Sequence, residues 1–200
     1  MTTRNRAGLW PVIFLLLSAP LAVAHEGSSG GGFLSGLSHP VGGLDHILAM
    51  VAVGLWGAQL GRPALWLLPV CFPLVMALGA ACGLLGFAVP AVETGIAGSA
   101  IVLGLMVMLE ARPALAAALS IVGFFAIFHG HAHGTELPPG QSGLLYSVGF
   151  VISTGLLHAS GIAIGLVHRW NVGRLALRAA GAVVLVGGLV FLGQGAGLLS

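Results

Sequence analysis

Six apolar segments, each close to the length that crosses a lipid bilayer, dominate this sequence. They lie at about residues 40–60, 64–89, 92–110, 113–133, 143–167 and 176–198. A helix that spans the hydrocarbon core of a bilayer needs about 20 apolar residues. Only 6% of the residues are charged, whereas a water-soluble domain carries about 25%. The sequence therefore predicts an all-α membrane protein, in which residues 25–200 form one bundle of six transmembrane helices in the lipid bilayer.

The first 24 residues have the organisation of a cleavable secretory signal peptide. Arg4 and Arg6 form a basic region, residues 9–17 form a short apolar region, and residues 22–24 read Ala-Val-Ala, a signal cleavage site. Cleavage there leaves His25 as the mature N-terminus, followed by a Gly- and Ser-rich stretch that we expect to be flexible. An uncleaved signal anchor is the alternative, and both place this end of the chain outside.

The arginines predict the orientation of the bundle. With the N-terminus outside, every arginine of the mature chain falls in or beside an inner connection: Arg62, Arg112, Arg169, Arg174 and Arg178. The outer connections contain neither lysine nor arginine, as the positive-inside rule requires. We therefore expect a multi-pass protein of the bacterial inner membrane with a periplasmic N-terminus. The acidic residues balance these arginines, and no basic cluster supports nucleic-acid binding.

Histidines and a glutamate gather at the outer end of the fourth segment, where residues 128–136 read FHGHAHGTE. On a helix, His129 and His133 lie one turn apart on one face, and Glu136 stays near that face. Two imidazoles and a carboxylate on one face form a metal-binding arrangement. His131 points the other way and is either a further ligand or a structural residue. The intervening glycines lower helix propensity and permit a local break.

The first segment supplies a second set of polar residues at the same membrane depth, where residues 38–47 read SHPVGGLDHI. A regular helix would separate His39 and His46 by about 10 Å. The two imidazoles can share one ion only if glycines 42–43 bend the chain. Asp45 can either ligate an ion or orient an imidazole through its second ring nitrogen.

Two ionisable residues in other segments have two interpretations each. Glu93, at the outer start of the third segment, is either a ligand or a solvated carboxylate. His158 lies deep in the fifth segment, one helical turn after Thr154. It is either a packing residue or, together with Thr154, part of the inner portion of an ion route.

The paired motifs resemble those of the HupE/UreJ family, and the resemblance covers nearly the whole chain. The matching residues are His39-Pro40-x2-Gly43-x-Asp45-His46 and Phe128-His129-Gly130-x-Ala132-His133-Gly134-x-Glu136. Members of this family are membrane proteins associated with hydrogenase or urease gene clusters and are regarded as nickel, sometimes cobalt, permeases. The resemblance implies ligand roles for His39, Asp45, His46, His129, His133 and Glu136, and it favours Glu93.

We therefore expect a permease, not an enzyme, that moves Ni²⁺, or alternatively Co²⁺, for urease or hydrogenase maturation. No organic cofactor is expected. The rival interpretation is an intramembrane zinc-dependent hydrolase, because histidines and carboxylates can also hold Zn²⁺ with an open position for water. His25 is either a mobile first collector of the ion or a terminal residue without a role. The sequence leaves a monomer and a homo-oligomer equally open.

Overall fold

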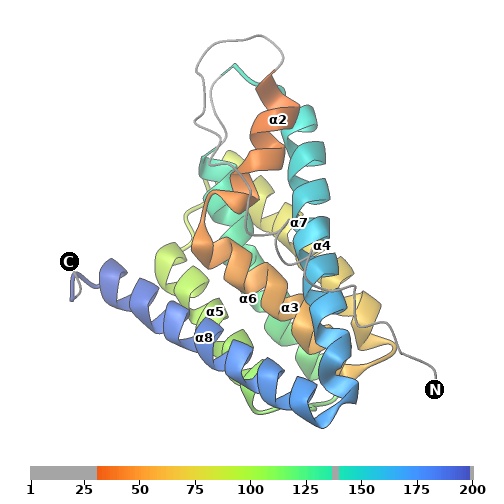
Figure 1. Cartoon of the computed structure of the whole chain (residues 1–200). Coiled ribbons are helices and arrows are strands. Elements are labelled where there is room, and N and C mark those ends of the chain that lie inside the picture. Colours follow the sequence, from red (N-terminus) through yellow and green to blue (C-terminus); the bar gives the residue numbers. More distant parts are fainter. Residues whose placement is uncertain (1–30, 137–139, 199–200) are drawn as a thin grey trace.

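The computed structural model describes residues 31–136 and 140–198, and these residues form helices joined by short connections, with no strand (Figure 1). The signal peptide predicted at residues 1–24 and the proposed collector His25 lie outside this part of the chain. The elements, in chain order, are α2 (Gly31–Ser38), η1 (His39–Val41), α3 (Leu44–Leu60), α4 (Ala64–Leu84), α5 (Val92–Met108), α6 (Leu115–Thr135), α7 (Gly143–Gly165), η2 (Leu166–Arg169) and α8 (Asn171–Gly195).

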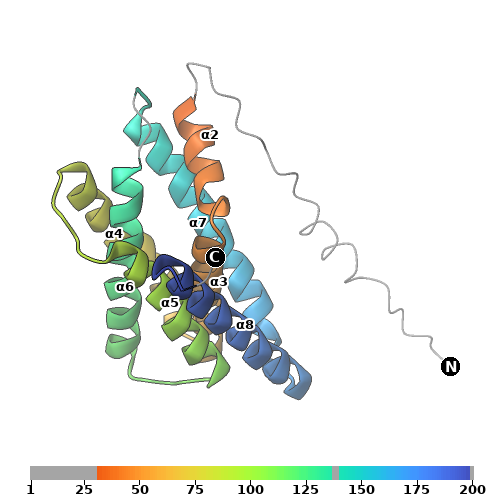
Figure 2. The same ribbon diagram turned by 90° about the vertical axis from the view of Figure 1, so that its left-hand side faces the viewer.

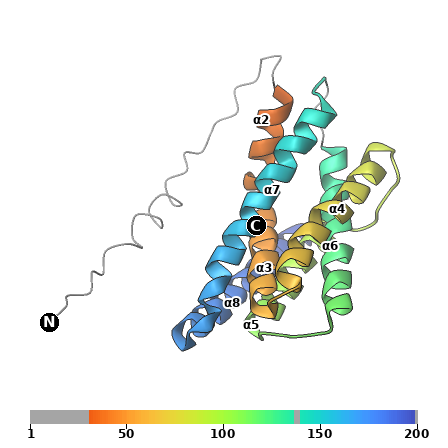
Figure 3. The ribbon, with the colours of Figure 1, turned by 90° about the vertical axis from the view of Figure 1, so that its right-hand side faces the viewer.

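The long helices pack mainly in pairs around α3. Helix α4 lies against α6, α5 lies against α8, and α7 lies against both α2 and α3 (Figures 2 and 3). Helix α3 also touches α4, α5 and α8, and it is buried along most of its length. Trp56 of α3, Phe72 of α4 and Leu103 of α5 are fully buried where the pairs meet. A central, buried α3 thus carries one of the two polar motifs into the middle of the bundle.

The outward faces of the bundle are apolar. On α4, the exposed side chains include Trp66, Val70 and Leu74, and on α8 they include Val183 and Val186. A water-soluble protein rarely exposes contiguous apolar surface of this extent. These faces therefore indicate a protein that is surrounded by lipid.

The number of membrane spans is confirmed in part. Helices α4, α6, α8 and the continuous pair α7–η2 are long and apolar enough to cross a membrane. The segment 32–41 and α3 meet at an angle of 78° and make a fifth span if the bent pair is counted as one. Helix α5 is apolar but has 17 residues. The structure thus supports four or five of the six predicted spans.

Helix α2 is a correction to the sequence prediction, which expected a flexible stretch through Gly32 and no helix before residue 40. Its backbone lies directly on α7, since a Cβ on Gly36 would overlap the Tyr146 carbonyl. A Cβ on Gly149 of α7 would likewise overlap the carbonyl of Phe33. Contact between two helix backbones therefore stabilises α2, and a contact of this kind is not visible in the local sequence.

Two predicted helix ends also change. Helix α4 ends at Leu84 and not near residue 89, because Gly86 adopts a φ of 75° and Phe87 N–H donates to the Cys82 carbonyl at 3.0 Å. This glycine-terminated pattern ends helices in general. Helix α8 begins at Asn171 and not near residue 176, since arginine-containing first turns are compatible with helix although they fall outside an apolar window.

The histidine-rich segment forms a continuous helix to Thr135, so the local break that its glycines permit does not occur. Gly130 and Gly134 face α4, and a Cβ on either would overlap the backbone of Met76 or Ala80. The missing side chains allow α4 and α6 to approach closely. This packing offsets the helix-propensity cost of about 1 kcal/mol per glycine.

Candidate metal centre

A bend at glycines 42–43 brings the two polar motifs together. Gly43 has an extended backbone, with φ −112° and ψ 124°, immediately before α3 begins. The bend turns His39 toward α6, where its ring centroid lies 4.7 Å from that of His133. The ring of His46 lies 4.3 Å from the same imidazole. Both histidines of the first motif therefore contact His133, which a regular helix would not allow.

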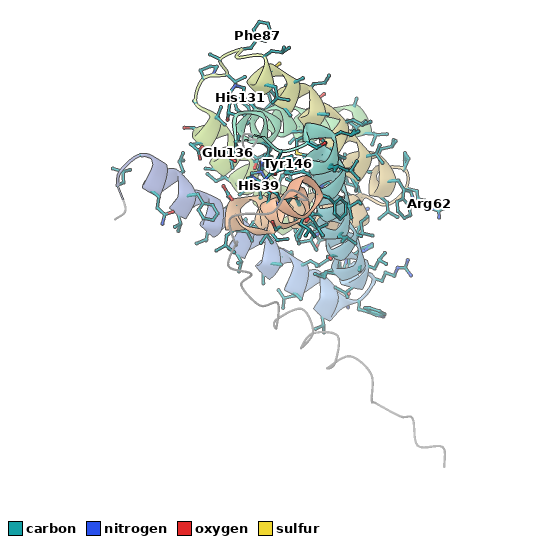
Figure 4. All side chains as sticks on the ribbon, turned by 90° about the horizontal axis from the view of Figure 1, so that it is seen from above. His39, Arg62, Phe87, His131, Glu136 and Tyr146 are labelled. Carbon is teal, nitrogen blue, oxygen red and sulfur yellow. The ribbon has the colours of Figure 1, made fainter. Side chains whose placement is uncertain are left out.

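His39, His133 and Glu136 form the outer part of the site. The Nε2 atom of His39 lies 3.2 Å from Glu136 Oε2, and His133 Nδ1 lies 3.9 Å from the same oxygen. Within the described residues, these three side chains offer ligand atoms that all lie within 4.8 Å of one another. Figure 4 shows His39 and Glu136 next to each other at the upper end of the bundle, far from Arg62. Two imidazoles and a carboxylate are suitable ligands for a divalent transition metal.

Imidazole contacts continue from His133 into the bundle. His133 Nε2 lies 2.5 Å from His46 Nε2, and His46 Nε2 lies 3.0 Å from His129 Nδ1. We call the series His39, His133, His46 and His129 the histidine file. A neutral imidazole has one donor and one acceptor nitrogen, so the tautomers decide which nitrogen of each contact donates.

Exposure falls along the histidine file. The side chain of Glu136 is 54% exposed and that of His39 is 30% exposed, whereas that of His133 is 6% exposed. His129, one helical turn deeper in α6, is fully buried. The file therefore leads from the surface into the interior of the bundle.

Two side chains hold the deeper imidazoles in position. The backbone N–H of His46 donates to Asp45 Oδ1 at 2.8 Å, and that oxygen lies 3.5 Å from His46 Nδ1. Ser99 Oγ lies 2.9 Å from His129 Nε2. Polar partners of this kind fix ring orientation and the nitrogen that remains free for a ligand. Asp45 thus acts on the His46 ring, in line with the second of its two predicted roles.

Glu93 lies at the same cavity without touching the histidine file. A cavity of about 480 Å³ is lined by Asp45, Glu93, Glu136 and three members of the file, His39, His46 and His133. Six water molecules occupy about 180 Å³ in the liquid, so the cavity is large enough for a hydrated ion. The three carboxylates make this cavity favourable for a cation.

His131 and His158 lie apart from this cavity. His131 Nε2 lies 2.8 Å from the Phe87 carbonyl in the α4–α5 connection, where Figure 4 also places both residues. This contact agrees with the structural interpretation of His131. His158 of α7 is buried and separated from His129 by Phe72, whose ring centroid lies 5.4 Å from His129 and 5.6 Å from His158.

Sequence reasoning missed two polar residues at the site. Ser99 is fully buried in α5 and touches His129. Tyr146, the single tyrosine of the chain, has its ring 5.8 Å from His39, and its buried hydroxyl has no hydrogen-bond partner within the described residues. A polar residue inside a predicted span was the available signal for Ser99. No local pattern in the sequence points Tyr146 toward His39.

Comparisons with known proteins agree with this arrangement. The family model described as "HupE / UreJ protein" matches residues 13–191. Protein HupE of Rhizobium leguminosarum bv. viciae is 44% identical over 172 residues, which are 86% of this chain and 90% of that protein. No solved structure shows a significant match.

Proposed function

The chain belongs to the HupE/UreJ family of hydrogenase- and urease-associated proteins of the nickel or cobalt permease type, and on that premise we propose that it carries Ni²⁺ across the bacterial inner membrane. In this proposal all six predicted segments span the membrane, the signal peptide is removed, and the histidine file opens to the periplasm. Ni²⁺ is the substrate, with Co²⁺ as the alternative, and it serves the maturation of a urease or a hydrogenase.

The falling exposure along the histidine file is the observation that carries this proposal. A resident metal needs one closed set of ligands, whereas a transported ion needs a series of sites from which it can move on. The Glu136 carboxylate and the His39 imidazole receive the ion, His133 contacts both the outer set and His46, and His129 ends the series. Glu93 and Asp45 add negative charge beside it.

The ligand types favour a borderline ion such as Ni²⁺ or Co²⁺. Imidazole suits Ni²⁺, Cu²⁺ and Zn²⁺, whereas thiolates select Cu⁺ and zinc. The outer set offers imidazole nitrogens and a carboxylate oxygen. Family membership supports nickel or cobalt within this group of ions. Movement inward is favoured by the membrane potential, by about 4.6 kcal/mol for a divalent cation at 100 mV.

An intramembrane zinc hydrolase is the second candidate, and the outer set itself favours it. Two histidines and a glutamate hold the catalytic zinc of several hydrolases, with one coordination position left for water. Such an enzyme would need one metal that stays bound during turnover. The deeper imidazoles of the histidine file would have no role in that chemistry.

Purified chain in sealed liposomes, with an imposed potential that is negative inside, separates the two functions. The permease proposal expects uptake of external Ni²⁺ that exceeds uptake by protein-free liposomes and is reduced by added Co²⁺. The hydrolase alternative expects release of water-soluble products from the lipids in a zinc-dependent manner. Lipid hydrolysis without nickel uptake would overturn the permease proposal.

A further inference from the structure

A second group of polar atoms lies on the far side of Phe72 from the histidine file. His158 and Thr154 of α7 are 1% and 0% exposed, and they lie one helical turn apart on the same face. Phe72 packs its ring edge against both His129 and His158. An ion that leaves His129 inward therefore meets His158 as the next imidazole within the described residues.

The polar atoms of this group are buried without hydrogen-bond partners. Neither ring nitrogen of His158 makes a hydrogen bond within the described residues, and the same is true of Thr154 Oγ1. A helical threonine ordinarily satisfies its hydroxyl on a carbonyl three or four residues earlier. Buried polar atoms are nearly always paired, so unpaired atoms on two adjacent side chains indicate a missing occupant.

Helix α4 adds a third polar atom. The carbonyl of Pro69 approaches the His158 ring without reaching hydrogen-bond geometry. Proline has no backbone N–H, so Pro73, four residues later in α4, cannot donate to this carbonyl. The Pro69 carbonyl is therefore free of its usual helical partner and is available to a ligand beside His158.

We propose that His158, Thr154 and the Pro69 carbonyl form an inner station that binds the transported divalent cation transiently on its way inward. This inference rests on the proposed permease function. The station offers one imidazole nitrogen and two uncharged oxygens, a ligand set that a borderline divalent metal accepts. It contains no carboxylate, so it binds the cation more weakly than the outer cavity does. Weak binding at the last station allows release.

Two bland occupants compete with the cation. A buried water molecule could bond to the same three groups, or His158 could serve packing alone. The structure permits a test because the two roles rank substitutions in opposite order. His158→Phe keeps a ring of similar volume without a ligand atom, and His158→Gln keeps a polar atom without the ring. Packing favours Phe over Gln, whereas ligation favours Gln over Phe.

The experiment measures the initial rate of Ni²⁺ uptake in liposomes and equilibrium Ni²⁺ binding to the purified chain. We expect His158→Phe to reduce the uptake rate at least tenfold, His158→Gln to retain more uptake than Phe, and both variants to bind Ni²⁺ at the outer cavity like the unchanged chain. His168→Phe is the matched control, because His168 lies in η2 and bonds to the Gly165 carbonyl. It should transport normally.

A second variant protects the test against misfolding. Thr154→Val is nearly isosteric and should reduce the uptake rate about threefold with unaltered outer binding. Uptake by His158→Phe equal to that of the unchanged chain, or greater uptake by Phe than by Gln, would overturn the inner station and leave the permease proposal intact. Absence of uptake by the unchanged chain would overturn both, so the two failures are distinguishable.

Discussion

The outer cavity and the buried group around His158 differ in charge and in pairing. In the outer cavity, ring nitrogens contact one another or a carboxylate, and Asp45, Glu93 and Glu136 surround them. Around His158, the polar atoms are uncharged and have no partners within the described residues. Both groups contain imidazole in an apolar bundle, but the outer cavity carries negative charge.

This difference teaches how one bundle can both capture and release an ion. Charge interactions strengthen as water is excluded, so carboxylates at a partly exposed cavity raise its affinity for a divalent cation. A deeper site without carboxylates lacks this attraction. The gradient of affinity would oppose inward movement, and the membrane potential acts in the opposite direction. Removal of ligands and charges from the outer cavity should therefore affect uptake in a graded order.

The largest effect is expected for His133→Ala. His133 contacts His39, Glu136 and His46, so its loss divides the histidine file and removes a ligand of the outer set. We expect nickel uptake by reconstituted liposomes to fall to the protein-free level. His131→Ala is the matched control from the same helix, because its ring turns to the Phe87 carbonyl. Equal loss in both variants would show that helix damage, and not ligation, explains the result.

Asp45→Asn should have the second-largest effect. The substitution keeps the shape of the side chain but removes the charge beside His46. Loss of a residue that orients a ligating histidine lowers metal affinity by about 10- to 100-fold. Titration of the purified chain with Ni²⁺ should show a weakening in this range. An unaltered affinity would mean that Asp45 does not orient His46 for binding.

Glu136→Gln should weaken capture by less. This carboxylate is about half exposed, so solvent screens part of its interaction with a cation. We expect the nickel concentration for half-maximal uptake to rise about tenfold, which corresponds to about 1.4 kcal/mol, with little change in the maximal rate. Glu110→Gln removes a carboxylate at the connection after α5 and should leave uptake unaltered. A similar shift in both variants would indicate a general effect of membrane-surface charge.

Ser99→Ala should have the smallest measurable effect. The hydroxyl contacts His129 at 2.9 Å, and one such neutral hydrogen bond contributes about 1 kcal/mol. We expect the uptake rate to fall by roughly threefold to fivefold, while nickel affinity at the outer cavity stays the same because Glu136 and His39 are untouched. A change in affinity without a change in rate would place Ser99 in capture instead of passage.

The sequence predicted the parts of the candidate site that depend on helical spacing. His129 and His133 share a face because they are one turn apart, and both contact His46. The membrane depth derived from the arginines correctly grouped Glu93 with the two motifs around one cavity. Whether these residues bind a metal stays a prediction.

The parts that depend on tertiary contact could not be predicted. The sequence offered the bend at glycines 42–43 only as a condition, since glycine permits many conformations. The packing of α2 on α7, which places Tyr146 near His39, depends on glycines that are far apart in the chain. The partner of His129 in α5, Ser99, is likewise visible only after the helices are assembled.

X-ray absorption spectroscopy of nickel bound to the purified chain tests the central claim most directly, namely that the outer cavity captures the ion through imidazole and carboxylate. The predicted spectrum contains nitrogen and oxygen ligands with the outer scattering of at least two imidazoles, and this imidazole scattering decreases in His133→Ala. Sulfur ligands from Cys71 or Cys82, or an imidazole signal that is the same in His133→Ala, would contradict the account.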